Sequence, residues 1–203
     1  MNLPNTLSIL RIILSPVFLL LFISDNVPAL TASFFIFTVA AVTDWYDGLY
    51  ARKYGYKTRW GQFIDPLADK ILTSSAFLGF YILEQKQPLF FGDNKFIPLW
   101  LLVIIIIFRD LILTAVRSYQ ELRGRNFRTS PVSKVKTFMQ MTYIFLFIGC
   151  YVFSSLYPGS WLATAGNFLL HSEINYYILI FIVIITLLSG ITYFFESGQE
   201  NRI

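Results

Sequence analysis

The sequence predicts an all-α integral membrane protein with six transmembrane helices, because of its composition and the length of its apolar stretches. Of 203 residues, 56% are hydrophobic and 18% aromatic, and the mean hydropathy is +0.60. A soluble domain of this length cannot bury that much apolar surface. A span needs about 20 mostly apolar residues. Six stretches qualify, at roughly 6–24, 29–50, 66–84, 97–118, 134–157 and 175–196.

No separate soluble domain fits between these stretches, so we expect residues 1–203 to form a single membrane-embedded domain. The first stretch carries Arg11 and is followed by no small-residue cleavage site, which favours a retained helix over a signal peptide. The single cysteine, Cys150, lies inside the fifth stretch and is expected to pack in the core. His171 is expected on the surface of an outer loop, and the last 60 or so residues look like generic membrane helix.

Basic residues set the predicted orientation, because cytoplasmic loops of membrane proteins are enriched in lysine and arginine. The loops on one side hold only Lys86 and Lys95. The other side, with both termini, is therefore expected to face the cytoplasm, where it would attract anionic headgroups and phosphorylated substrates. Nucleic acid is not expected as a partner. The basic residues on that side include Arg11, Arg52, Lys53, Lys57, Arg59, Lys70, Arg117, Arg123, Arg125, Arg128, Lys134 and Lys136.

Four aspartates lie in two pairs where the second stretch ends and the third begins. Asp44 and Asp47 are three residues apart and Asp65 and Asp69 are four apart, so each pair shares one face of a helix. Hard divalent cations such as Mg²⁺ and Mn²⁺ take oxygen ligands of this kind. At a membrane surface such ions are expected to hold a phosphate or a diphosphate.

The depth of Asp44 favours a cation site over a structural role. Some 22 Å of helix separates Asp44 from Ala29, which is less than the roughly 30 Å hydrocarbon core. A carboxylate at that depth is costly unless it is paired, so we expect it to face a water-accessible cavity inside the bundle. The alternative is that the aspartates form interfacial salt bridges with Arg52, Lys53 and Lys70, a role that does not need so many carboxylates.

The aspartates and the residues between them form the pattern D-x2-D-G-x2-A-R-x8-G-x3-D-x3-D. All eight positions match, at Asp44, Asp47, Gly48, Ala51, Arg52, Gly61, Asp65 and Asp69. This pattern resembles the signature of the CDP-alcohol phosphatidyltransferase family. The six predicted spans agree with the six-helix membrane fold of that family.

The resemblance implies a reaction in which an alcohol attacks the phosphorus next to diacylglycerol in CDP-diacylglycerol and releases CMP. It implies that the four aspartates hold two divalent cations, Mg²⁺ or Mn²⁺, and that Asp69 is also the base that deprotonates the acceptor. It further implies a homodimer in the cytoplasmic membrane of a bacterium, with its active site facing the cytoplasm. The residues expected to line the CDP site are Gly48, Ala51, Arg52 and Gly61.

Three further segments resemble the branch of this family that forms phosphatidylglycerol phosphate from sn-glycerol 3-phosphate. They are NLPNTLSILRIILSP near the N-terminus, FRDLILTAVR at 108–117 and SPVSKVKTFMQM at 130–141. Ser8, Asp110 and Ser133 stand where the branch has threonine, glutamate and glycine. None of these departures removes a charge.

Glycerol 3-phosphate is a dianion that needs cationic ligands. The candidates for a phosphate clamp are Arg109, Arg117, Lys134 and Lys136. Arg109 can equally be the structural partner of an aspartate. Asn5 and Thr6 are candidates for contact with the nucleotide, although Asn5 can instead cap the first helix. Thr137 and Gln140 are candidates for supporting groups near the same end.

Three rival functions stay open at this point. Within the family, the acceptor can be inositol phosphate, serine or phosphatidylglycerol, and an enzyme acting on serine needs no phosphate clamp. Membrane prenyltransferases also bind a diphosphate through aspartate pairs and Mg²⁺, but they are longer and lack the D-G-x2-A-R core. A divalent-cation transporter would place its acidic residues at the midplane, whereas all four aspartates lie toward one face.

Overall fold

The computed structural model describes the backbone of residues 3–54, 59–88, 90–122 and 131–200, and the side chains of residues 6–43, 64–88, 90–120 and 132–191. The described backbone holds seven helices and no strand, which confirms the all-α prediction for this part of the chain. The helices are α1 (Leu3–Phe22), α2 (Val27–Tyr54), α3 (Arg59–Lys86), α4 (Leu99–Leu122), α5 (Pro131–Leu156), α6 (Trp161–His171) and α7 (Glu173–Glu200).

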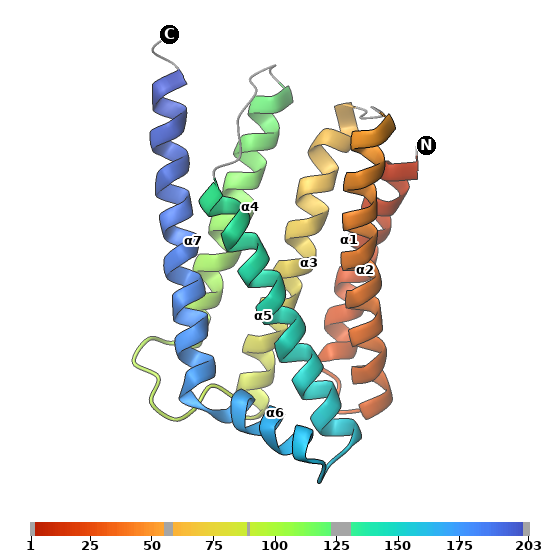
Figure 1. The fold of residues 1–203 in the computed structure, drawn as a ribbon, viewed down its shortest axis with the longest axis vertical. Coiled ribbons are helices and arrows are strands. Elements are labelled where there is room, and N and C mark those ends of the chain that lie inside the picture. The colour runs from red at the N-terminus through yellow and green to blue at the C-terminus, as the bar shows by residue number, and fades with distance from the viewer. Residues whose placement is uncertain (1–2, 55–58, 89, 123–130, 201–203) are drawn as a thin grey trace.

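The six long helices alternate in direction and form one bundle, while the short helix α6 lies across one end of it (Figure 1). We call the other end the signature end, because α2 ends there and α3 begins there, within the segment that carries the aspartate pattern. The beginning of α1, the end of α4, the beginning of α5 and the end of α7 lie at the same end. The alternation therefore gathers segments from all six long helices around one end.

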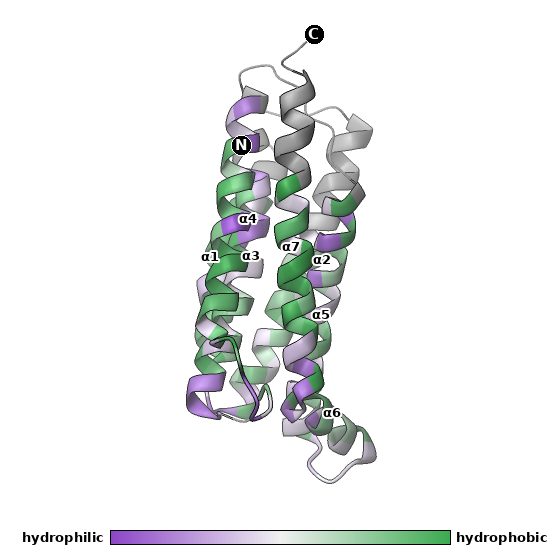
Figure 2. Cartoon of the chain, turned by 90° about the vertical axis from the view of Figure 1, so that its left-hand side faces the viewer, coloured by the Kyte–Doolittle hydropathy of each residue, from purple (hydrophilic) through white to green (hydrophobic). Residues whose placement is uncertain are grey.

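Three helical stretches in the described residues are long and apolar enough to cross a membrane. They belong to α4, α5 and α7 and cover Leu99–Gln120, Val132–Leu156 and Glu173–Ile191. Shorter apolar stretches lie in α1 and α2, at Thr6–Phe22 and Val27–Thr43. Figure 2 shows the apolar residues running along the middle of the long helices. All six predicted stretches fall on long helices. In the described residues, three of these helices are long and apolar enough to cross a membrane.

The helices are longer than the apolar stretches that predicted them. Around the signature, α2 continues to Tyr54 and α3 already begins at Arg59, whereas the apolar stretches stop near 50 and resume near 66. Hydropathy detects only the part of a helix that matches a hydrocarbon core, but a helix that has already formed adds one hydrogen bond for each further residue. The signature residues therefore lie on helices.

Helix α6 corrects the prediction of an outer loop before the last stretch. Ser160 caps it, since its hydroxyl oxygen accepts a hydrogen bond from the Ala163 backbone N–H at 3.1 Å. Trp161 and Phe168 are exposed, while Leu170 is buried against the bundle. An 11-residue helix is too short to span a bilayer, so the length of an apolar stretch does not predict it. His171 is exposed as expected, but it ends this helix and stacks on Phe90.

Aromatic packing joins α1 to its neighbours and fixes the position of that helix. Phe18 contacts Phe37 of α2 with ring centroids 5.3 Å apart, and Phe22 contacts Phe80 of α3 at 5.9 Å. Phe80 also lies 4.1 Å from Phe147 of α5. These five rings are almost completely buried. Since α1 packs against both α2 and α3, its N-terminal half lies beside the aspartate-bearing helices. Cys150 packs against the same core, as predicted.

The connection between α3 and α4 is tied to the start of α7. The Tyr176 hydroxyl accepts a hydrogen bond from the Ile97 N–H at 2.8 Å and donates one to the Ile97 carbonyl at 2.9 Å. The Asn175 side chain donates to the Phe90 carbonyl at 2.9 Å. Gly92 lies in the left-handed region at φ +69°, where a Cβ would meet the Glu173 Cγ at 2.8 Å. The close approach therefore requires glycine at this position.

We expect Gly92→Ala to lower the free energy of unfolding by about 2 kcal/mol, because the substitution adds a clash to the strain of a positive φ. The matched control is Gly159→Ala, since Gly159 also has a positive φ (+99°) but nothing within 4 Å of its Cβ position. Thermal unfolding in detergent would compare the two variants. Equal losses of unfolding free energy in the two variants would show that the clash with Glu173 does not add to the strain of the positive φ.

Candidate functional site

The antiparallel arrangement of α2 and α3 brings the two aspartate pairs to matching levels. Asp44 lies ten residues before the end of α2 and Asp69 ten residues after the start of α3, which puts each about 15 Å from the helix end. Asp47 and Asp65 also lie at similar levels, each about 10 Å from the same helix ends. The helices therefore place the pairs at common depths. The predicted residues whose side chains lie outside the described part are Asn5, Asp44, Asp47, Gly48, Ala51, Arg52 and Gly61.

Asp65 is held by a hydroxyl from α1. The Ser8 side chain, which is fully buried, donates a hydrogen bond to the Asp65 Oδ1. These residues are 57 positions apart in the sequence and meet because α1 packs along α3. Threonine, which the family branch carries at this position, would offer the same hydroxyl. The departure at Ser8 therefore keeps the group that contacts the carboxylate.

Asp69 lies one turn further along α3 and forms an ion pair with its neighbour. The Lys70 Nζ is 2.8 Å from the Asp69 Oδ2, and both side chains are largely buried. The salt bridge that the sequence left as an alternative is thus present for this aspartate. It occupies one carboxylate oxygen and does not exclude a second ligand on the other.

The described carboxylates fit a hard divalent cation. Asp65 and Asp69 present partly exposed oxygen donors one helical turn apart, and carboxylate oxygens are the ligands that Mg²⁺ and Mn²⁺ prefer. Among the described side chains no three ligating groups gather. Asp44 and Asp47, the other half of the predicted set, lie outside those residues.

Asp110 of α4 is the centre of a second charged group, which we call the cationic cluster and define as Arg109, Asp110 and Lys136. The Asp110 Oδ1 accepts a hydrogen bond from the Lys136 Nζ of α5 and another, at 3.1 Å, from the Arg109 Nη1. Asp110 and Lys136 are almost completely buried, with 3% and 2% of their side chains exposed. Burial of such charges is tolerable only when they are paired. The cluster carries one net positive charge.

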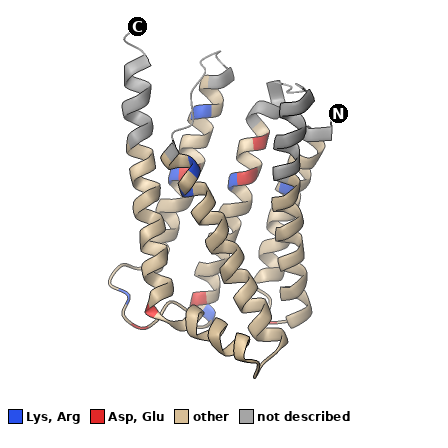
Figure 3. Ribbon diagram, viewed as in Figure 1, with Lys and Arg blue, Asp and Glu red and all other residues tan. Residues whose placement is uncertain are grey.

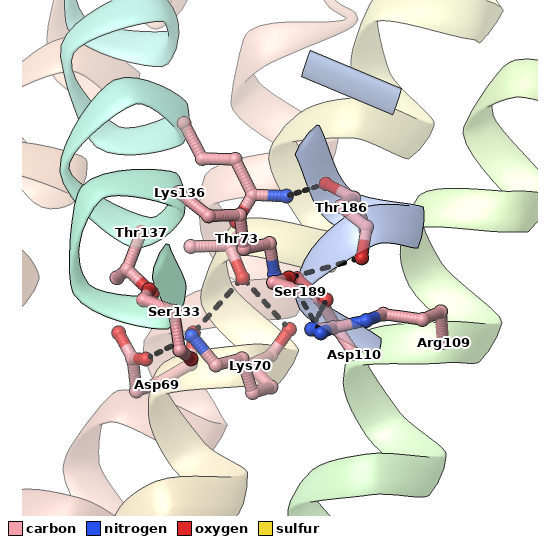
Figure 4. Close-up of polar contacts among 11 residues, drawn as sticks. Asp69, Lys70, Thr73, Arg109, Asp110, Ser133, Lys136, Thr137, Thr186 and Ser189 are labelled. Carbon is pink, nitrogen blue, oxygen red and sulfur yellow. Dashed lines mark hydrogen bonds and ion pairs between the residues drawn. The ribbon is translucent and has the colours of Figure 1, made fainter. Parts of the chain in front are cut away.

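The cationic cluster and the aspartates form one continuous polar region near the signature end. Figure 4 shows Asp69 and Lys70 of α3 beside Ser133 and Lys136 of α5, with Asp110 of α4 close by. Lys70 is near enough to Asp110 and Lys136 to interact with them electrostatically. Figure 3 shows acidic and basic residues on several long helices toward the signature end, well away from the charged residues near α6. A phosphate bound by the cluster would thus lie next to the carboxylates.

The four residues predicted to clamp a phosphate do not share one environment. Arg109 and Lys136 meet at Asp110, so Arg109 is indeed the partner of an aspartate, as one interpretation had it. Lys134 is exposed, two positions from Lys136, and Arg117 is half-buried two turns beyond Arg109 on α4. The structure therefore brings two of the four together and places the other two nearer the signature end.

At the N-terminus, α1 begins at Leu3, so Asn5 lies inside its first turn rather than in front of it. The alternative role of Asn5 as a helix cap is therefore wrong, because a cap residue precedes the first helical residue. Thr6 is exposed.

The sequence did not indicate that residues of α1 and α7 contribute to this region. It assigned no role to Ser8 beyond its departure from a pattern, and it treated α7 as generic. In the structure, Ser189 of α7 accepts a hydrogen bond from the Arg109 Nη2 at 2.6 Å. The Gln140 side chain, considered only as a supporting group, reaches Thr186 of α7 at 3.5 Å. The signal in the sequence was the presence of hydroxyl residues and a glycine in an otherwise apolar helix.

A comparison of the whole chain with known protein families shows its family. The model of the family "CDP-alcohol phosphatidyltransferase" matches residues 1–188. The chain belongs to this family. The resemblance that rested on eight signature positions is thereby confirmed. Membership, together with the apolar helices, identifies a membrane protein.

Curated relatives carry more specific names. The chain is similar to a "Probable phosphatidylglycerophosphate synthase" of Mycobacterium tuberculosis, at 39% identity over 72% of this chain and 66% of the relative, so it spans about two thirds of that protein's length. It is similar to a "CDP-diacylglycerol--glycerol-3-phosphate 3-phosphatidyltransferase" of Wigglesworthia glossinidia brevipalpis, at 34% over 80% of this chain and 89% of the relative. A protein of the same name from Rickettsia typhi is 30% identical over 95% of each chain.

Proposed function

We propose that this protein is a membrane-embedded transferase that forms phosphatidylglycerol phosphate and CMP from CDP-diacylglycerol and sn-glycerol 3-phosphate, in phospholipid biosynthesis. The single observation that carries the choice of acceptor is the cationic cluster directly beside the aspartates of the family signature. The names of the relatives agree with this reaction. Serine as acceptor would give the cluster no phosphate to neutralise.

In the proposed site, the CDP part of the lipid lies between α2 and α3, along Gly48, Ala51, Arg52 and Gly61, with Asn5 and Thr6 near the nucleotide. The small residues let a bulky ligand approach the backbone, and Arg52 offers a bidentate fork to a phosphate. Asp44, Asp47, Asp65 and Asp69 would hold two divalent cations, Mg²⁺ or Mn²⁺. When bound, these ions neutralise charge on the diphosphate oxygens and stabilise CMP as leaving group.

The acceptor phosphate is placed at the cationic cluster, with Arg117 and Lys134 at its entrance. This position directs the far hydroxyl of glycerol 3-phosphate toward Asp69, which takes the hydroxyl proton on its carboxylate. The hydroxyl oxygen then forms a bond to the phosphorus next to diacylglycerol, and the bond from that phosphorus to CMP breaks. The residues therefore contribute mostly positioning and charge, which govern displacement at phosphorus.

The membrane arrangement that we propose has six spans, formed by α1 to α5 and α7, with the signature end at the cytoplasmic side of a bacterial cytoplasmic membrane. The basic residues around this end support that orientation. The exposed Trp161 of α6 supports an interfacial position for the opposite end, since tryptophan is enriched at membrane interfaces. Residues 1–203 form one catalytic domain in this proposal, and the functional unit is a homodimer.

The test is CMP release by the purified protein in detergent, with CDP-diacylglycerol and either Mg²⁺ or Mn²⁺. Glycerol 3-phosphate, inositol phosphate, serine and phosphatidylglycerol are offered in parallel. We expect release with glycerol 3-phosphate, and none after chelation of the cations, because the diphosphate charge is then no longer neutralised. Release with serine alone would contradict the proposed role of the cationic cluster.

A further inference from the structure

We propose that α7 positions the acceptor-binding arginine, with Ser189 anchoring the guanidinium of Arg109 and Gly190 providing the space in which it lies. Both are positioning residues, since they act on the substrate only through Arg109. This inference rests on the proposed function, because Arg109 is assigned to the acceptor phosphate there. It gives a role to a helix that carries no signature residue.

Ser189 has the hydrogen-bond polarity that an anchor for arginine needs. Its hydroxyl donates its hydrogen to the Thr186 carbonyl at 3.0 Å, which leaves the oxygen to accept from the Arg109 Nη2 at 2.6 Å. Ser189 is buried, with 2% of its surface exposed, so water does not compete for this bond. Asp110 and Ser189 hold one nitrogen each, at Nη1 and Nη2. Because a guanidinium has five N–H donors, others stay available for a phosphate.

Gly190 lies against the same guanidinium. A Cβ at this position would be 3.3 Å from the Arg109 Nε and 3.7 Å from its Nη2, and also 3.6 Å from the Leu113 Cδ1. Any side chain here would therefore press on the arginine from the α7 side. The absence of a side chain at 190 and the hydroxyl at 189 act on the same group, one by leaving room and the other by fixing its direction.

Helix packing explains why the site needs this helix. Helix α7 packs against both α4 and α5, whereas the backbones of the described parts of α4 and α5 stay apart and these helices meet through the long Lys136 side chain at Asp110. Arg109 lies on α4 and Lys136 on α5, so α7 holds the two cation-bearing helices in place. The side chain of Gln140 on α5, which is buried, reaches the buried Thr186 of α7 and strengthens this link.

The test compares Ser189→Ala, which loses the acceptor oxygen, with Ser189→Thr, whose hydroxyl can make the same bonds from a helix. Leu188→Ala is the control, since Leu188 is exposed on the neighbouring position of α7. For Ser189→Ala we expect the KM for glycerol 3-phosphate to rise about tenfold, because a hydrogen bond to a charged group is lost. The KM for CDP-diacylglycerol and the kcat should stay within about twofold to threefold. Ser189→Thr and Leu188→Ala should resemble the parent.

A second variant and a readout that needs no activity complete the test. Gly190→Val should raise the KM for glycerol 3-phosphate as well, since its branched side chain displaces the guanidinium. The rate at which phenylglyoxal modifies Arg109, followed by mass spectrometry of the peptide, should rise about threefold in Ser189→Ala and stay unchanged in Leu188→Ala.

The possible outcomes separate the inference from the proposed function. If the parent releases no CMP with glycerol 3-phosphate, the proposed function fails, and the Arg109 modification rate alone decides whether Ser189 is its anchor. If the parent is active but Ser189→Ala keeps its KM for the acceptor, the inference is overturned. Equal increases in the KM of both substrates would also overturn it, since they indicate a general disturbance of the bundle.

Discussion

Asp69→Asn is expected to reduce the kcat for CMP release at least about a thousandfold, which is the largest effect of any single substitution considered. The change removes the carboxylate that accepts the hydroxyl proton, and general-base catalysis alone contributes about 10² to 10⁴. It also removes one of four proposed cation ligands at a place where asparagine supplies a weaker, neutral oxygen. The measurement is CMP release under saturating CDP-diacylglycerol and glycerol 3-phosphate.

The control for this prediction is Asp93→Asn, an exposed aspartate in the connection between α3 and α4 at the α6 end. It makes the same chemical change far from the signature end and should leave kcat within about twofold. Thermal unfolding of both variants would show that they are folded. Activity of folded Asp69→Asn above a tenth of the parent's would exclude Asp69 as the base.

Asp110→Asn is expected to cost about 3 to 5 kcal/mol of unfolding free energy, because it removes the only carboxylate shared by Arg109 and Lys136 in the described structure. Lys136, with 2% of its side chain exposed, would then be a buried charge without its partner. We also expect CMP release to fall about a hundredfold, since the side chains of Arg109 and Lys136 would both move. The measurements are thermal unfolding in detergent and CMP release.

Two further variants separate the structural and functional parts of this effect. The double substitution of Asp110→Asn with Lys136→Met removes the buried charge together with its partner, so it should recover most of the stability. It should not recover activity, because the acceptor phosphate has still lost a cation. Asp110→Glu keeps the charge and supplies the residue that the family branch carries, so it should retain more activity than Asp110→Asn. A fully active double variant would contradict a role for Lys136 in acceptor binding.

The sequence by itself determined the family and the all-helical class, and it predicted where the proposed chemistry lies. The spacing of Asp44, Asp47, Asp65 and Asp69 carried the chemical information, because residues three or four apart share a helix face wherever the helix lies. Hydropathy located the six long helices for an equally local reason, since each apolar stretch is continuous in the chain. It did not detect α6, whose 11 residues are too few for a span.

Only the tertiary structure decided which side chains meet. Ser8 contacts Asp65 across 57 residues and Arg109 contacts Ser189 across 80, and both contacts depend on how helices pack. Nothing in the sequence near Arg109 distinguishes a partner on α3 from one on its own helix or on α7. The hydrogen bonds of buried polar groups must be satisfied somewhere, but spacing along the chain says only that a partner is needed. The packing of α7 against α4 and α5 supplies it, because this packing brings a serine and a glycine to the guanidinium.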